Sequence, residues 1–546
     1  MTVFLALQIM VAKAANIPLM PIKDIEPGMW GVGKTVIAGD TIEEFYAEVV
    51  GVSGTETSGY SILVRLSGDL IDKTGGVAQG MSGSPVYIDG RLVGAVAYGK
   101  AFNDPHYCFL TPIGSMLKML DTPQKQHTDW IPKGTALAAG GFTELGLNCL
   151  KEDLGKHGLE VTMGVNSGEE STKPLEPGSS VGASLLTGDI TLGALGTVTW
   201  TDDEGHILAF GHPFMNRGDS SFFMNRAWVL GVIPNMQSAY KVGNIGSAMG
   251  IINQDRSSGI AGLVGGEPKA IPLVINVHDA SRGVSNTMRA RVIDDEILVP
   301  AIVNAAAISS IGRTSDRALM GTAKVKYQVT GAGSDKKYLE FKHENMYYAT
   351  ENLEKAVMQE LVENLKVLMA NKFERLDIYG INVDVDVTDA IQVAEIVKVT
   401  ANDKHVRPGD TVSLNVVMRP FRGKEFTQVV EFTVPKKGTG SKLVLNVHGG
   451  SSVSWILNLL RKQKDDGAGE GKKEQKQKTL TDYVKEVNEA DKNNSLIIDI
   501  TSGVKGLSNA KADAGLESML KGSPYKKVVS YDFIVDGEAE VVLNLE

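Results

Sequence analysis

The chain has 546 residues, 42% of them hydrophobic and 22% charged, as in an ordinary globular protein. This length is more than one hydrophobic core holds, so roughly two to four domains are expected. A net charge of −10 and a pI near 5.6 argue against a nucleic-acid-binding protein. The 60 glycines, beside many short Val, Ile and Leu runs, favour a mainly β protein with tight turns.

The first fifteen residues form an apolar run that ends in Ala12-Lys13-Ala14, a small-x-small pattern that suits signal peptidase. The run is too short to cross a bilayer, so we expect residues 1–15 to be a signal peptide and the protein to be exported. A buried N-terminal strand or helix is the alternative. No other segment has the ~18 consecutive apolar residues of a membrane helix, so no integral membrane span is expected.

Two β-rich blocks follow, the first over 22–120 and the second over 182–276. In the first, the Asp89-Gly90 pair between apolar runs predicts a tight hairpin. Further elements are expected as strands at 45–50, 60–66, 86–88, 92–97, 190–192, 196–200 and 206–210, and as helices at 112–120 and 143–158. A hairpin turn is expected at 202–205.

The C-terminal part mixes helix and strand signals. Apolar residues at helical spacing predict a helix over 352–371, followed by a strand over 378–387. We therefore divide this part into a helix-plus-strand segment (331–395), a β-sandwich-like module (396–461), a polar linker (462–478) and a small α/β segment (479–546).

The hexapeptide from Gly80 to Pro85, Gly-Met-Ser-Gly-Ser-Pro, is the most informative motif. Its glycines allow a tight turn in which the Ser82 hydroxyl is exposed and neighbouring N–H groups converge. Ser82 is therefore the candidate nucleophile, and the N–H groups of Gly80 and Ser82 are the candidate oxyanion hole. Ser84, at the start of the next strand, is expected to be structural.

A serine nucleophile needs a base, and His212 is the best-placed histidine because it ends an apolar strand between Gly211 and Pro213. His106 lies in a polar turn, and His206 and His278, in a hairpin turn and after a strand, are expected to be exposed.

Asp255 follows His212 within the same β-rich block, and we select it as the carboxylate that orients the imidazole. Asp69, Asp72 and Asp219 remain alternatives, as does a Ser/His dyad without an acid. If Asp255 has only a structural role, it is expected to be a turn residue that forms a salt bridge with Arg256.

The two cysteines, Cys108 and Cys149, have no metal-type spacing, so neither a metal nor another cofactor is expected. Two buried thiols are favoured over one disulfide.

The segment 73–85 and the apolar hairpin after it resemble the nucleophile block of the SpoIVB (stage IV sporulation) serine peptidase family. Residues 196–199 and 210–212 look like the block that carries that family's histidine. Over roughly residues 20–290, the resemblance implies a chymotrypsin-like double β-barrel, with Ser82 as nucleophile and His212 as base. We assign residues 16–330 to this peptidase region.

The chain departs from the family pattern in two ways. Ser82 precedes His212, whereas the family's histidine block precedes its serine, so the two barrels have exchanged order. The family's aspartate has no clear match here; Ser67 falls near its place, with Asp69 two residues away. Longer bacterial homologues with this serine-first order and C-terminal β modules are similar in organisation.

The expected function is that of a serine endopeptidase acting on protein or peptide substrates. A catalytically inactive peptidase-like scaffold that acts as a cell-envelope binding protein is the alternative, and a self-processing precursor is a third. Nothing in the sequence predicts an oligomeric state.

Overall fold

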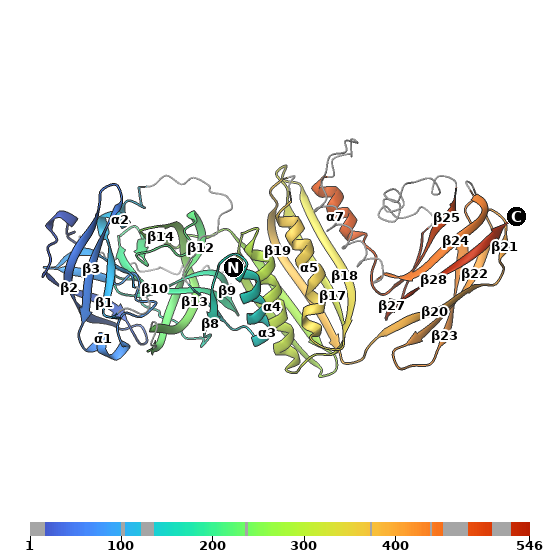
Figure 1. Ribbon diagram of the computed structural model, residues 1–546, viewed down its shortest axis with the longest axis horizontal. Helices are drawn as coiled ribbons and strands as arrows, with labels where there is room; N and C mark the ends of the chain where they lie inside the picture. The colour runs from blue at the N-terminus through green and yellow to red at the C-terminus, as the bar shows by residue number, and fades with distance from the viewer. Residues whose placement is uncertain are drawn as a thin grey trace, which may run out of the picture. The chain divides into compact units, whose positions relative to one another are not determined.

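A computed structural model describes residues 17–99, 104–121, 136–234, 239–371, 374–436, 439–450, 479–504 and 526–546. The fold is mainly β, as predicted (Figure 1). The chain divides into two compact units, the first comprising residues 1–274 and 288–309 and the second residues 275–287 and 310–546. The expected signal peptide (1–15) and polar linker (462–478) lie outside the described residues.

The first barrel is a closed ring of six antiparallel strands in the order β1-β2-β3-β6-β5-β4. Its strands are β1 (Trp30–Val36), β2 (Ile42–Thr55), β3 (Gly59–Ser67), β4 (Pro85–Ile88), β5 (Arg91–Tyr98) and β6 (Tyr107–Pro112). Alternate residues of β3, namely Ile62, Val64 and Leu66, are buried in the barrel core. Asp89 and Gly90 both have positive φ, which confirms the predicted hairpin between β4 and β5.

The second barrel is built from six strands in the order β9-β12-β13-β14-β11-β10, and the pairing of β9 with β10 closes the ring. They are β9 (Ser180–Gly188), β10 (Thr191–Thr201), β11 (His206–Ala209), β12 (Gly218–Ile233), β13 (Tyr240–Arg256) and β14 (Gly259–Val264). Strands β7 (Leu137–Gly140), β8 (Val161–Met163) and β16 (Val284–Ile293) extend it. Two closed rings in one unit agree with the expected double barrel.

Among the residues that the structure describes, the helices of the first unit are short, with one exception. They are η1 (Ile22–Asp24), α1 (Asp69–Thr74), α2 (Ile113–Leu117) and α3 (Glu144–Gly155). The exception, α4 (Leu298–Ser315), was not predicted; α4, β16 and β15 (Ala270–Asp279) each contribute residues to both units. No helix in the described ranges is both long and apolar enough to cross a membrane.

The second unit begins with a helix on a sheet. Strands β18 (Tyr338–Ala349), β17 (Gly321–Ala332) and β19 (Asp377–Thr388) pair in that order, and α5 (Leu353–Met369) contacts β17 and β18. The predicted apolar face of α5 is buried, including Leu361 and Leu365, except for Val367, which is exposed. A later helix, α7 (Leu480–Asn488), also contacts β18.

The rest of the second unit consists of two sheets around one core. The first contains β23 (Phe426–Thr433), β22 (Thr411–Pro420), β20 (Val393–Ala401) and β27 (Ile534–Asp536). The second contains β21 (His405–Val406), β28 (Glu538–Leu545), β24 (Thr439–Gly449), β25 (Ser495–Val504) and β26 (Lys527–Ser530). Because β27 and β28 complete sheets that start before residue 450, the predicted modules 396–461 and 479–546 are interleaved in one pair of sheets.

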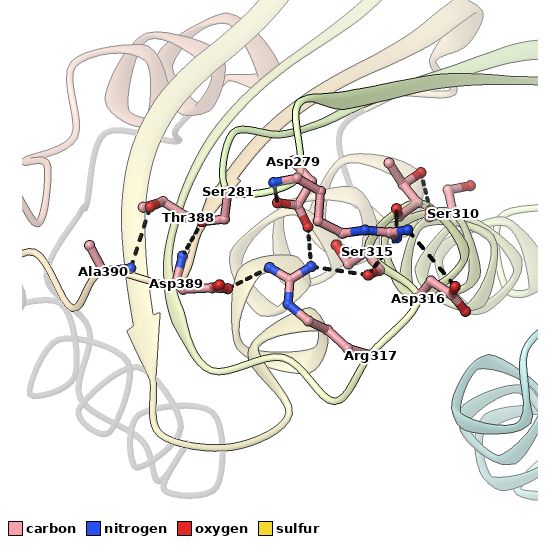
Figure 2. A network of polar contacts seen from close by, with 11 residues as sticks. Asp279, Ser281, Ser310, Ser315, Asp316, Arg317, Thr388, Asp389 and Ala390 are labelled. Carbon is pink, nitrogen blue, oxygen red and sulfur yellow. Dashed lines mark hydrogen bonds and ion pairs between the residues drawn. The ribbon is translucent and has the colours of Figure 1, made fainter.

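A polar cluster ties together three chain segments of the second unit (Figure 2). The Arg317 guanidinium lies 2.5 Å from Asp279 at the end of β15 and also contacts Asp389 after β19. It donates a further hydrogen bond to the carbonyl of Ser315, and Arg282 donates to the same carbonyl. The guanidinium therefore fixes the end of α4 against two strand ends by paired charge.

Candidate active site

Ser82 lies in the turn between α1 and β4, and the N–H groups of this turn fall into two sets. Four donate hydrogen bonds of 2.7–2.9 Å: Gln79 to Ala239, Met81 to Ala78, Gly83 to Val96, and Ser84 to Met81. Within the described part of the chain, the N–H groups of Gly80 and Ser82 donate to no acceptor. These two N–H groups are the predicted oxyanion donors.

The turn packs backbone to backbone against the second barrel, and Gly83 makes this possible. Its φ is +95°, and a Cβ there would lie 1.9 Å from the carbonyl oxygen of Thr197 and 2.5 Å from the nitrogen of Phe210. Thr197 donates its N–H to the carbonyl of Ser82 over 2.8 Å. Thr199 donates its hydroxyl to the carbonyl of Gly83 at the same distance. Any side chain at position 83 would separate the serine turn from β10.

The two serines of the motif have different environments. Ser84 is fully buried and donates its hydroxyl to the carbonyl of Met81 over 2.6 Å, which confirms its structural role. Ser82 is only partly buried, and its hydroxyl makes no hydrogen bond among the described residues. An accessible, uncommitted hydroxyl is what a nucleophile needs.

His212 follows β11 in a loop whose conformation is set by two left-handed residues, Phe210 and Gly211. The carbonyl of Gly211 accepts a 2.6 Å hydrogen bond from the Thr111 hydroxyl of the first barrel. The Nδ1 atom of His212 lies 2.8 Å from the carbonyl of Pro213, so Nδ1 carries the proton and donates it. Nε2 then has the lone pair with which a general base acts.

Burial controls the protonation of His212. It lowers the pKa of the imidazole below its usual value, and the hydrogen bond to Pro213 opposes this only in part. The ring is therefore neutral at pH 7, as a base that takes a proton from serine has to be.

Asp255, at the end of β13, is completely buried and holds the loop after His212. One carboxylate oxygen accepts the N–H of Phe214, and the other accepts the N–H groups of Met215 and Arg217, over 2.7–3.1 Å. Burial raises the pKa of Asp255 to about 6, against these hydrogen bonds and the charge of Arg217. None of its contacts within the described residues involves the imidazole, so the link between Asp255 and His212 runs through the loop backbone.

The serine turn and the histidine loop meet at Thr197. Its N–H binds the carbonyl of Ser82, and its own carbonyl accepts the N–H of Phe210 over 3.2 Å. The fold thus brings the two predicted segments against the same residue of β10. Among the described contacts there is no hydrogen bond between the Ser82 hydroxyl and the His212 ring.

The alternative candidates have other partners or are exposed. Asp69 and Asp72 are exposed on α1, and Asp219 pairs with Arg256 over 2.7 Å. Three other histidines contact polar groups near them in sequence: His106 contacts Asp104, His206 contacts Asp202, and His278 contacts Ser285. None of these residues contacts the serine turn or the His212 loop among the described hydrogen bonds and ion pairs.

One buried residue beside the serine turn was not predicted. Lys241, near the start of β13, is 7% exposed, and its Nζ lies within 3.2 Å of the hydroxyls of Thr35 and Thr197. A single lysine in a strand is typical of a solvent-exposed position, and the sequence offers no signal that strands from both barrels cover this one.

Asp202, Glu204 and His206 form the one group of potential metal ligands among the described residues. The Asp202 carboxylate accepts the N–H groups of Glu204 and His206 and contacts the His206 ring, which explains the group as an ordinary hairpin turn. Cys108 and Cys149 are buried and free of a disulfide, which confirms the favoured prediction for them.

Comparison with curated proteins finds no significant match, and neither does comparison with solved structures. A family model does match, over a part of the chain that includes the first barrel and the serine turn but neither His212 nor Asp255. Residues 8–117 match the model of the SpoIVB peptidase S55 family, the same family that the Gly-Met-Ser-Gly-Ser-Pro turn resembles.

Proposed function

We propose that the protein is a serine endopeptidase that cleaves protein substrates through an acyl-enzyme on Ser82. The SpoIVB peptidase S55 family match implies serine peptidase activity and hence a protein substrate. One observation carries the assignment of the site: among the described residues, the N–H groups of Gly80 and Ser82 have no acceptor, while Gln79, Met81, Gly83 and Ser84 donate theirs. That is the arrangement an oxyanion hole requires.

In the proposed reaction, the Ser82 hydroxyl attacks the carbonyl carbon of the scissile peptide while Nε2 of His212 takes the hydroxyl proton. The oxyanion that forms accepts hydrogen bonds from the N–H groups of Gly80 and Ser82. Collapse of this intermediate breaks the C–N bond, and His212 gives its proton to the leaving amine. Water, deprotonated by His212, then hydrolyses the acyl-enzyme and restores Ser82.

Two groups hold His212 for this task. The Pro213 carbonyl accepts the Nδ1 proton and so fixes the tautomer that leaves Nε2 basic. Asp255 binds the backbone of the next residues and is a positioning residue in this proposal. The hydrogen bond between the Ser82 hydroxyl and Nε2 forms when substrate is bound, since catalytic hydrogen bonds are often loose in free enzymes.

A fluorophosphonate probe followed by peptide mapping tests the proposal. We expect a single adduct, on Ser82, and no adduct in Ser82→Ala. Ser84→Ala is the matched control, because Ser84 belongs to the same turn but its hydroxyl is buried and bonded to Met81; it is expected to keep the adduct. An adduct elsewhere, or none, contradicts the proposal.

A non-catalytic scaffold that binds proteins at the cell envelope is the second candidate. The observation that favours it is that Ser82 and His212 share no hydrogen bond among the described contacts. The scaffold predicts that neither the wild-type protein nor any variant reacts with the probe. The chain length of the same samples tests self-processing. If the protein cleaves itself, the wild-type chain is cut while Ser82→Ala stays at full length.

We also propose that the protein is exported, from the apolar run and the small-x-small pattern of residues 1–15. Sequencing the N-terminus of the protein recovered from its native cells tests this. A new terminus shortly after Ala14 is the expected result, and retention of Met1 contradicts it.

A further inference from the structure

Lys241 brings an amine to the junction between the two barrels. Its stem lies across Gly80, where an added Cβ would come within 3.0–3.1 Å of three carbons of the lysine. Its Nζ lies 3.1 Å from the hydroxyl of Thr35 on β1 and 3.2 Å from the hydroxyl of Thr197 on β10. The lysine therefore contacts one strand from each barrel and the turn between them.

The contacts continue from Lys241 into the serine turn. Thr197 donates its hydroxyl to the carbonyl of Gly80 over 2.9 Å, while its N–H binds the carbonyl of Ser82. The backbone N–H of Lys241 also donates to the carbonyl of Gln79 over 2.9 Å. A chain of hydrogen bonds thus runs from the amine through Thr197 to the peptide whose neighbours provide the oxyanion donors.

The surroundings of the amine suit its neutral form. An ammonium has three N–H donors, but only two oxygen atoms contact Nζ among the described residues. A neutral amine has two N–H groups, and the hydroxyls of Thr35 and Thr197 accept both of them, so neither N–H lacks an acceptor. Burial lowers the pKa of Lys241 to about 7.

No charged group offsets this burial in the described part of the chain. The serine turn presents backbone to the amine, β1 and β10 present hydroxyls, and β12 places Val232 opposite Lys241 in the strand register. No carboxylate or second cation contacts Nζ there, and desolvation alone shifts the amine.

We propose that Lys241 is a positioning residue of the peptidase, whose neutral amine acts through Thr197 to fix the Gly80 carbonyl and so aim the N–H groups of Gly80 and Ser82. This inference rests on the proposed function. Gly80 and Ser82 can share one oxyanion only if the peptide between them keeps its orientation, and the Gly80 carbonyl is the part of that peptide that Thr197 holds.

Protonation of Lys241 adds a third N–H, which has no acceptor among the described residues, so it disturbs the turn. Two protonations then suppress activity as the pH falls: Lys241 near neutrality and His212 below its usual range. The acid limb of the rate profile is expected to begin near neutral pH and to become steeper than a single ionisation allows.

Lys241→Met tests the proposal because methionine keeps an apolar stem over Gly80 and removes the amine. At pH 8 we expect the rate of phosphonate labelling at Ser82 to fall about tenfold to a hundredfold, with folding stability retained or raised. The acid limb should become a single ionisation at lower pH, that of His212. Lys156→Met, which removes an exposed lysine of the same unit, is expected to change neither the rate nor the profile.

Substitutions at Thr197 keep the proposal testable if Lys241→Met does not fold. Thr197→Ser retains the hydroxyl and should restore most of the rate that Thr197→Val loses. Thr199→Val removes a hydroxyl that binds Gly83 but does not contact the amine, so its acid limb should match that of the wild type. Equal rates for Thr197→Ser and Thr197→Val would overturn the proposal.

A readout that does not depend on activity is the NMR titration of 13Cε-labelled lysine. The resonance absent from Lys241→Met is expected to titrate near neutral pH, and titration above pH 9 overturns the proposal. If the wild-type protein takes no label at Ser82, the proposed function fails and this inference with it. Labelling that is equal in wild type and Lys241→Met, with the same acid limb, overturns only the role of Lys241.

Discussion

Two sites, one in each unit of the molecule, treat buried charge in opposite ways. In the first unit, Lys241 and Asp255 are both buried at the ends of β13. Lys241 contacts hydroxyls and Asp255 contacts backbone N–H groups, so hydrogen bonds to neutral groups, joined at Asp255 by the charge of Arg217, have to compensate for burial. Burial dominates at both positions, lowering the pKa of Lys241 to about 7 and raising that of Asp255 to about 6.

In the second unit, Asp279 is as inaccessible to solvent as Asp255 but lies beside a cation (Figure 2). Burial alone would raise its pKa, yet hydrogen bonds from Arg317 and other neighbours outweigh burial and hold the pKa below its usual value. Arg317 is shared with Asp389, and these two carboxylates raise its own pKa further.

The difference shows which region responds to pH. A paired arginine and aspartate keep their charges throughout the physiological range, so the cluster at the end of α4 acts as a constant brace. Groups buried against neutral partners change protonation between about pH 6 and 7, the range in which a serine and its base have to be tuned. The serine turn and the His212 loop each rest on one such group.

The largest expected effect comes from removing the proposed nucleophile and its proposed base. Ser82→Ala and His212→Ala should each lower peptide hydrolysis by about 10⁴-fold or more, and the double variant should be no worse than either. The reason is that a hydroxyl and its base act as one unit. The rate of cleavage of an unstructured protein such as casein measures these losses. If the losses of the two single variants add up in the double variant, Ser82 and His212 do not act as one unit.

The next effect tests the paired charge of the second unit. Arg317→Met leaves Asp279 buried without its cation and should reduce the free energy of unfolding by about 3–4 kcal/mol. Denaturant unfolding measures the loss, and hydrogen exchange in β17 and β19 assigns it to this unit. Labelling at Ser82 is expected to stay unchanged.

Arg419→Met is the matched control for Arg317→Met. Arg419 pairs with Glu395 on the exposed surface of the same unit, so its removal should cost less than about 1 kcal/mol. Equal losses in the two variants would show that burial of Asp279 is not what makes the Arg317 cluster matter.

Features whose chemistry is local could be predicted from the sequence. The serine turn needs glycines at fixed positions, and Asp89-Gly90 makes a tight hairpin wherever apolar strands flank it. The helix α5 has an apolar face at helical spacing, because only one side of it is buried. In each case the physical requirement falls on residues adjacent in sequence or one helical turn apart.

Features that depend on distant segments could not be predicted. The helix α4 was missed because it is buried on nearly every side, so its run of alanine and isoleucine shows no amphipathic period. Lys241 reads as a surface residue until β1 and β10 cover it. Asp255 was selected for its nearness to His212, but only the folded loop shows that its oxygens bind backbone N–H groups rather than the imidazole.

The pH dependence of stability separates the two buried aspartates. Because the folded pKa of Asp255 lies above its usual 3.8, the folded state binds more protons than the unfolded chain between about pH 4 and 6. Its contribution to stability therefore falls as the pH rises, by roughly 2–3 kcal/mol over that interval. Asp279 has the opposite sign: its contribution is present above its unfolded pKa and is lost as the pH falls through its lowered folded pKa.

Measurements of the free energy of unfolding between pH 4 and 7 test these opposite pH dependences of Asp255 and Asp279. Asp255→Asn should remove the decline with rising pH in the first unit, and Arg317→Met should leave that decline in place. If the free energy of unfolding of Asp255→Asn still falls as the pH rises, another group takes up the proton in the folded state.

The smallest expected effect, the loss of kcat/KM in Asp255→Asn, tests whether Asp255 acts on His212 through the loop or directly. Asn in its place offers one oxygen and one amino group, so at least one of the N–H groups of Phe214 and Met215 loses its acceptor and the loop loosens. If the carboxylate acts through the loop, kcat/KM should fall by about tenfold to a hundredfold. Loss of a carboxylate that orients an imidazole directly costs about 10⁴-fold.

Asp219→Asn is the control for Asp255→Asn, because Asp219 was an alternative acid and its carboxylate already pairs with Arg256. We expect it to change kcat/KM less than about threefold, since a partly exposed ion pair contributes little. A 10⁴-fold loss in Asp255→Asn would mean that the carboxylate reaches the imidazole during the reaction, and the loop contacts would then describe only the resting enzyme.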